Sequence, residues 1–131
     1  IIDKGILNTF LLSLYGSRKT GLKRSVNDGE AFVIEPGKTM FDDMVKSVEK
    51  GVLLSRFSGG SPADNGDFSG VAKNSYLIEK GKIAYPITEA MISGNMADLL
   101  MDITNVSAER TDFGFAVLPY VAASGITVSG K

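Results

Sequence analysis

Residues 71–87, VAKNSYLIEKGKIAYPI, decide the fold class of this chain because they predict a β-hairpin. Two runs rich in β-branched and aromatic residues, Val71–Glu79 and Lys82–Ile87, flank a Lys-Gly pair, and Gly81 lets the chain turn at positive φ. Alternate residues of the second run are apolar, as in a half-buried strand. Pro86 has no N–H for a ladder, so we expect this strand at a sheet edge or with a bulge at that residue.

Apolar residues spaced three and four apart predict two helices, at about Met40–Lys50 and Met96–Val106. Thr39 would cap the first helix and Gly51 would follow its end, while Asn95 would cap the second. The apolar surface of the second helix is wide, so we expect it to be covered on two sides.

A third, shorter helix is predicted over Leu12–Lys19, although Ile6–Leu14 fits a strand equally well. Other strands are predicted at Ala31–Glu35, Val52–Phe57, Phe113–Leu118 and Ile126–Ser129. The glycine-rich stretch Ser58–Gly70 predicts a long loop. Strands outnumber helices and hairpin connections are short, which indicates an α+β fold with a mostly antiparallel β-sheet and two or three helices. With 131 residues, 44% of them hydrophobic, we expect a single domain, residues 1–131, with a real core.

The composition excludes several kinds of site. The chain has no histidine and no cysteine, so it lacks the commonest general base, the commonest metal ligand and any thiolate. We therefore expect no catalytic residue, no metal site and no cofactor in this chain. Its 14 basic and 15 acidic residues give no overall field to attract nucleic acid or a membrane. It begins with Ile1 and has neither a signal sequence nor a spanning apolar run, so we expect a cytoplasmic fragment of a longer protein.

Four short motifs resemble functional sites, but each is better explained structurally. Gly37–Thr39 resembles the end of a phosphate-binding loop, yet position 32 lacks the required glycine, which favours a turn before a helix. Asp64–Asp67 could offer oxygens to a cation but is also an ordinary turn sequence. The basic cluster Arg18–Arg24 is typical of a solvated face. The serines of Ser58–Pro62 have no histidine to act as a base.

Several motifs in the second half of the chain follow one another in a specific order. They are Gly66–Gly70, Leu77–Ile83, Pro86, Ile92–Asn95, Pro119 and Gly125–Gly130. This order resembles the TldD/PmbA family, closely over Gly51–Lys131 and more weakly over Ile1–Lys50. The resemblance implies that the chain is the C-terminal domain of a longer TldD/PmbA-like protein.

Members of that family are regarded as zinc metalloproteases and as proposed modulators of DNA gyrase. The family resembles a two-subunit assembly, in which a TldD-type catalytic chain with an H-E-x-x-x-H motif works beside a PmbA/TldE-type partner. The catalytic chain also carries a cysteine near its C-terminus, which this chain lacks. The resemblance therefore implies the PmbA/TldE-like side, with zinc only in the catalytic partner subunit.

The resemblance and the glycine-rich stretch together suggest a substrate- or partner-binding site. We expect the site to contain Ser58, Gly59, Gly60, Asp67, Phe68, Ser69 and Asn95. Exposed strand edges bind extended peptides through backbone groups, and glycines permit close approach. The expected function is that of a non-catalytic subunit or domain, which supports a zinc metalloprotease that cuts unfolded peptides, beside a TldD-like catalytic subunit or in a homodimer. The alternative is an assembly or peptide-binding module with no proteolytic role. Nucleic-acid binding is disfavoured by the balanced charge.

Overall fold

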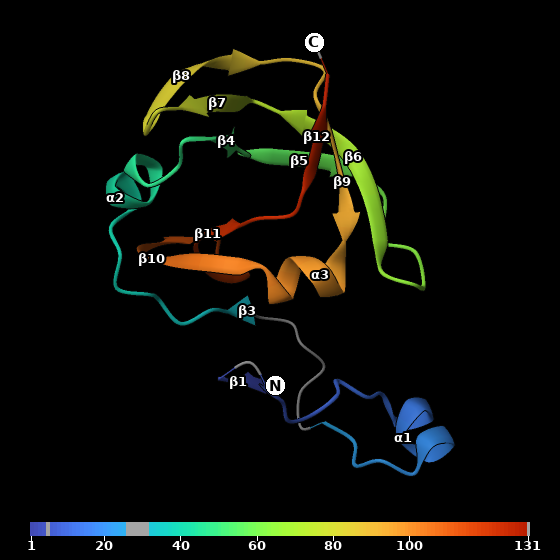
Figure 1. The fold of residues 1–131 in the computed structure, drawn as a ribbon. Coiled ribbons are helices and arrows are strands. Elements are labelled where there is room, and N and C mark those ends of the chain that lie inside the picture. Colours follow the sequence, from blue (N-terminus) through green and yellow to red (C-terminus); the bar gives the residue numbers. More distant parts are fainter. Residues whose placement is uncertain (5, 26–31, 131) are drawn as a thin grey trace. The chain divides into compact units, whose positions relative to one another are not determined.

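The computed structural model describes residues 1–4, 6–25 and 32–130, and they separate into two compact units. One unit is Ile1–Ile34 with Asp112–Leu118, and the other is Glu35–Thr111 with Pro119–Lys131. The fold is α+β, with mostly antiparallel strand pairs and three described helices, as predicted (Figure 1).

The smaller unit contains short elements. They are β1 (Ile2–Asp3), β2 (Ile6–Leu7), α1 (Leu14–Thr20), β3 (Phe32–Val33) and the start of β11 (Ala116–Ala123). β1 pairs with β2 antiparallel, and β3 pairs with β11 in parallel. The Ser13 side chain accepts a hydrogen bond from the Gly16 N–H at the start of α1, and Gly21 ends the helix at a φ of 74°. The short helix is confirmed, slightly shifted, and the alternative strand is confined to Ile6–Leu7.

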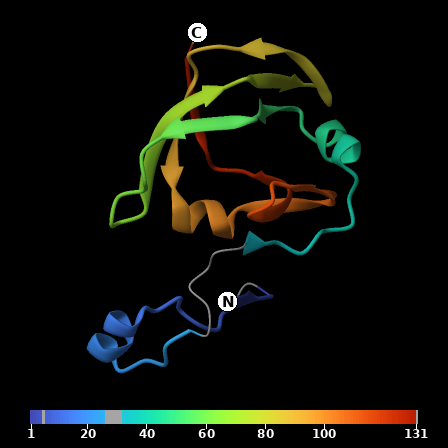
Figure 2. The same cartoon turned by 180° about the vertical axis from the view of Figure 1, so that it is seen from behind.

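The larger unit contains two antiparallel sheets. The first has the order β4 (Lys50–Leu53), β7 (Ser75–Glu79) and β8 (Lys82–Ile87). The second has the order β12 (Thr127–Ser129), β9 (Met91–Asn95), β6 (Asp67–Lys73) and β5 (Arg56–Gly59). The other elements are α2 (Phe41–Lys46), α3 (Met96–Met101), β10 (Ile103–Asp112) and the end of β11. In Figures 1 and 2, β7 and β8 lie at one end of this unit and α3 with β10 at the other.

One long hairpin runs through both sheets and bends at a corner. β5 pairs with β6 in one sheet, whereas β4 pairs with β7 in the other. The predicted strands Val71–Glu79 and Val52–Phe57 are therefore wrong as single strands, because the corner divides each of them. Asn74 takes up the bend with a φ of 50°, which asparagine tolerates better than most residues.

The buried hydroxyl of Ser75 holds this corner together. Its Oγ accepts a hydrogen bond from the Ser55 N–H at 3.2 Å and donates one to the Lys73 carbonyl at 2.9 Å. Ser75 is fully buried, so these bonds satisfy a hydroxyl that water does not reach. The corner thus depends on one side chain that joins both strands.

The predicted hairpin at Gly81 is confirmed, and β8 is an edge strand. Its irregularity is not at Pro86: Leu77 faces Tyr85 while Ile78 faces Ile83, so the bulge lies between them at Ala84. The expected half-buried face is also wrong, since the side chains of Ile83 and Tyr85 are 45% and 54% exposed. An edge strand can expose apolar alternate residues, and alternation alone does not reveal what covers them.

The first long helix is shorter than predicted. Thr39 is not its cap, because it forms a β-bridge with Ser107, and Met40 occupies the N-cap position. The Glu109 carboxylate accepts the Phe41 N–H instead, at 2.9 and 3.0 Å from its two oxygens. Gly51 does not follow the helix end either, because it lies in β4.

The second long helix is also shorter than predicted. Asn95 is its N-cap, as expected, and accepts the Ala97 N–H at 2.9 Å. The helix nevertheless ends at Met101, and Ile103–Asp112 forms a strand. The expected cover on two sides is wrong, since Met101 is 84% exposed. Apolar residues three apart fit both a helix face and a strand that begins partway along the run.

The remaining strand predictions hold in part, since β3, β11 and β12 lie within or overlap the predicted runs, and β9 was missed. Ala31 of the first of these runs lies outside the described residues. The buried core cluster is small and consists of Ala72, Ala90 and Ile92. Three partly buried side chains, Phe68, Ile87 and Ile126, pack against it. This cluster anchors β6 and β9 beneath the candidate site.

Candidate functional site

The structure places the predicted site residues around one end of the second sheet. Ser58 and Gly59 lie in β5, Asp67, Phe68 and Ser69 lie in β6, and Asn95 ends β9. Gly59 faces Gly70, and Asp67 faces Asn95. The predicted loop Ser58–Gly70 is therefore wrong at both ends, because only residues 60–66 connect the strands, Gly60 among them.

A tight turn closes the connection between β5 and β6. The Gly66 N–H donates to the Ala63 carbonyl, and the Ala63 N–H donates to the Asp67 carbonyl, both at 2.8 Å. Gly66 has a φ of 89°, the left-handed conformation that such a turn requires after its two central residues. Asp64 and Asn65 thus form part of a turn, as expected from an ordinary turn sequence.

Three polar side chains form a cluster, Asn65, Asp67 and Asn95, beside this turn. Asn95 Nδ2 donates to Asp67 Oδ1 at 2.9 Å, and Asn65 Nδ2 donates to Asp67 Oδ2 at 2.7 Å. Asn95 Nδ2 also donates to the Asn65 carbonyl at 3.0 Å. These amide donors, Asn95 first and Asn65 second, lower the pKa of Asp67. Within residues 1–4, 6–25 and 32–130 there is no group of three metal-ligating side chains.

The lowered pKa of Asp67 predicts a loss of stability in acid. A carboxylate whose native pKa is depressed contributes stability above its ordinary value of 3.8, and that contribution disappears as the pH falls through the native pKa. We expect Asp67→Asn to flatten the decline in urea midpoint below pH 3.8, measured by circular dichroism. Asp64→Asn in the same exposed turn is the control. An unchanged decline in Asp67→Asn would show that the cluster does not depend on this charge.

The other side of the site is apolar. The rings of Phe57 and Phe68 meet edge to face, with centroids 5.9 Å apart. They help to line a cavity of about 360 Å³. Its other lining residues are Leu54, Gly60, Pro62, Ile92, Met96, Leu99 and Ile126. Gly59 and Gly70 let the Phe57 ring approach the sheet, since a Cβ on either would lie 2.5 Å from a ring carbon.

The outer side of β5 has free backbone groups. β5 ends its sheet, so no described strand pairs with that side. The Ala72 N–H donates to the Ala90 carbonyl, away from β5. Phe57 faces Ala72, so the N–H and C=O of Phe57 point away from β6, and those of Gly59 two residues later do the same. These groups can accept an additional strand.

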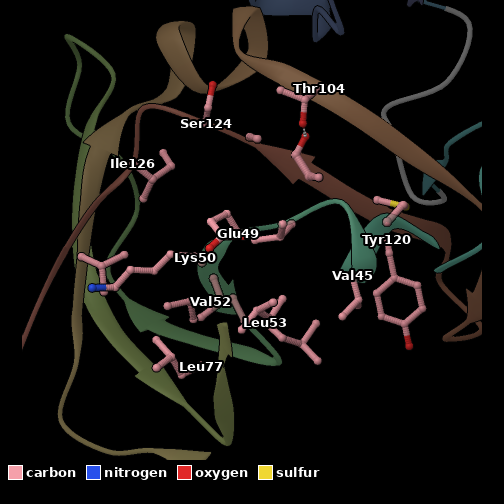
Figure 3. Close-up of a pocket in the computed structure, with 18 of the residues that line it drawn as sticks. Val45, Glu49, Lys50, Val52, Leu53, Leu77, Thr104, Tyr120, Ser124 and Ile126 are labelled. Atoms are coloured by element: carbon pink, nitrogen blue, oxygen red, sulfur yellow. Dashed lines mark hydrogen bonds between the residues drawn. The ribbon is translucent and has the colours of Figure 1, made fainter. Parts of the chain in front are cut away.

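A second, larger cavity of about 880 Å³ lies between α2, β4, β7 and the segment that leads to β12. Figure 3 shows the apolar side chains of Val52, Leu53, Leu77 and Ile126 around it. Tyr120 also lines it and stacks on Phe41, with ring centroids 4.3 Å apart. Sequence reasoning missed this cavity because its walls come from elements far apart in the chain.

Comparison with known proteins points to one family. The sequence model of the PmbA/TldA metallopeptidase C-terminal domain matches residues 1–130. The chain is 34% identical over 134 residues to the metalloprotease PmbA homolog of Buchnera aphidicola from Acyrthosiphon pisum, covering 100% of this chain and 30% of the relative. It is 32% identical over 133 residues to metalloprotease PmbA of Escherichia coli O157:H7, covering 95% and 29%.

Solved structures show the same fold. A crystal structure of a proposed modulator of DNA gyrase from Bacteroides thetaiotaomicron has a TM-score of 0.88 and 29% identity, over 99% of this chain and 30% of that one. TldE from Thermococcus kodakarensis has the same fold, with a TM-score of 0.80 at 24% identity, over 98% and 33%. The chain thus spans about a third or less of the relatives it matches. None of its described helices has the length and apolar character needed to cross a membrane.

Proposed function

Since the chain belongs to the TldD/PmbA family and matches the C-terminal domain of its metallopeptidases, we propose that it binds extended polypeptide for a zinc metalloprotease. In this proposal the domain itself does no chemistry. A TldD-like partner subunit would hold the zinc, which would supply the hydrolytic chemistry.

The free edge of β5 is the observation that carries the proposal. The outward N–H and C=O groups of Phe57 and Gly59 can pair with any extended chain, whatever its side chains. An unfolded polypeptide offers such backbone groups at every residue except proline. A β-addition site therefore suits a protease that accepts many unfolded sequences.

The apolar cavity beside β5 adds a second requirement. Its lining is almost entirely aliphatic and aromatic, with the rings of Phe57 and Phe68 on one wall. Side chains of a strand alternate between two faces, so a peptide along β5 would present every second side chain to one face. We expect such a site to prefer apolar side chains at alternate positions.

We propose that zinc ligation lies outside these 131 residues, because they contain no imidazole and no thiolate. The PmbA/TldE-like side is proposed because this chain lacks the cysteine that a TldD-type chain carries near its C-terminus, and the PmbA names of the two relatives reported above support it. The TldE structure supports only the shared fold.

An assembly module is the second candidate function, and the exposed apolar surface favours it. In the smaller unit Ile2, Ile6 and Phe10 are each more than half exposed. Exposed apolar patches often mark interfaces between proteins. Such a surface would pack against another domain or subunit and bind no substrate.

Photocrosslinking at the β5 edge separates the two candidates. We expect a photoreactive amino acid at the exposed Ser58 of the full-length protein to capture an unfolded reporter peptide, in the presence of the TldD-type subunit. The same label at exposed Lys80, on the turn between β7 and β8, is the matched control and should capture none. Mass spectrometry of the crosslinked products measures how much reporter peptide is captured at each position.

Cleavage of the peptide without capture at Ser58 would favour the assembly module. Ser58 is a better probe than Phe68, because the Phe68 ring packs on the core and its removal would disturb folding. A chelator should stop cleavage yet leave capture intact, since the β5 edge needs no metal.

A further inference from the structure

The turn between β5 and β6 contains a chemically reactive pair of residues. Asn65-Gly66 is the one asparagine–glycine pair in the sequence. Glycine has no side chain to shield its nitrogen, so this nitrogen can attack the neighbouring asparagine side chain. Asn65 is also exposed, which gives water access to the intermediate.

We propose that Asn65 is a deamidation site that the folded protein keeps closed, so that it reacts only when the turn opens. The Gly66 nitrogen loses its proton and bonds to Asn65 Cγ, and the side-chain nitrogen leaves as ammonia. The product is a five-membered succinimide. Water then opens either carbonyl of that ring, which leaves aspartate or isoaspartate at position 65.

Hydrogen bonds engage both reacting groups in the folded turn. The nucleophile is engaged, because the Gly66 N–H donates to the Ala63 carbonyl at 2.8 Å. The electrophile is held at both ends: Asn65 Nδ2 donates to Asp67 Oδ2 at 2.7 Å, and Asn65 Oδ1 accepts the Asp67 N–H at 3.1 Å. In this proposal these bonds must open before the Gly66 nitrogen attacks Cγ.

The reaction would change the structure beyond the turn. A carboxylate at position 65 can no longer donate to Asp67 and places a second negative charge beside it. Asn95, the other donor to Asp67, also caps α3 through the Ala97 N–H. Isoaspartate additionally lengthens the backbone by one carbon, which disrupts the turn. Deamidation of Asn65 therefore loosens the start of α3.

Peptide mapping of the full-length protein tests the proposal. Trypsin releases residues 57–73, in which Asn65 is the only asparagine. We expect conversion at mildly alkaline pH to be slower in the native protein than in urea by about tenfold or more, because the reaction must wait for local opening. Native conversion within about twofold of the rate in urea would overturn the proposal.

Two variants test whether the Asp67 side chain protects Asn65 from deamidation. Asp67→Ala removes a partner of Asn65 and should speed native conversion by about tenfold. Asp64→Ala, in the same turn, should leave the rate unchanged. Equal rates in the two variants would also overturn the proposal, provided circular dichroism shows both folded. If Asp67→Ala unfolds, the comparison of wild-type protein with and without urea decides the question alone.

Discussion

Gly37→Ala is expected to lower the free energy of unfolding by about 3 kcal/mol or more. A Cβ at Gly37 would overlap the backbone carbonyl of Val106 and could not be accommodated by a side-chain movement. The segment would have to leave β10, which would break the bond from the Gly37 N–H to the Ser107 carbonyl, 2.8 Å long. The nearby bond from the Ala108 N–H to the Thr39 carbonyl would weaken with it.

Urea denaturation of Gly37→Ala followed by circular dichroism gives the measurement. Gly60→Ala is the matched control, because no heavy atom beyond its two chain neighbours lies within 4 Å of the position its Cβ would take. A Gly37→Ala protein as stable as the control would mean that the segment before α2 does not pack on β10.

Ile92→Ala is the other substitution with a large expected effect, a loss of about 2 to 5 kcal/mol. Ile92 is 4% exposed and packs with Ala72 and Ala90 at the centre of the core cluster. Truncation removes buried methyl groups and enlarges the space around them, since Ile92 lines both described cavities.

The neighbouring residue supplies the control for Ile92. Met91 lies on the opposite face of β9 and is 48% exposed, so Met91→Ala should cost well under half as much. The urea midpoints of both variants, analysed with the same dependence of free energy on urea concentration, give the difference in their free energies of unfolding. Equal losses of stability in the two variants would show that Ile92 does not pack in a core formed by β6 and β9.

Features set by a few neighbouring residues were predictable. The turn at Gly81 and the N-cap at Asn95 depend on backbone geometry and short hydrogen bonds, and both are confirmed. The helix ends were not, because they depend on distant partners. The Val48 and Glu49 carbonyls accept the N–H groups of Gly81 and Lys80, which takes both residues out of the predicted helix.

The candidate site shows the same division. Its residues were proposed from a glycine-rich stretch and a family resemblance and do lie together, but most of them are in strands. The free edge of β5 was not predictable, because an edge is defined by the absence of a neighbouring strand. The asparagine–aspartate cluster depends on a register that pairs Asp67 with Asn95, 28 residues apart.

By itself the sequence determined that this domain has no imidazole or thiolate chemistry, that its strands are mostly antiparallel, and which family it belongs to. Residue identity and local periodicity carry that information directly. Only the tertiary structure decided where the strands change sheets, which edge is free and which glycines leave no room for a Cβ. Those properties depend on contacts between segments far apart in the chain, such as the Ser75 hydroxyl at the corner and Gly37 against Val106.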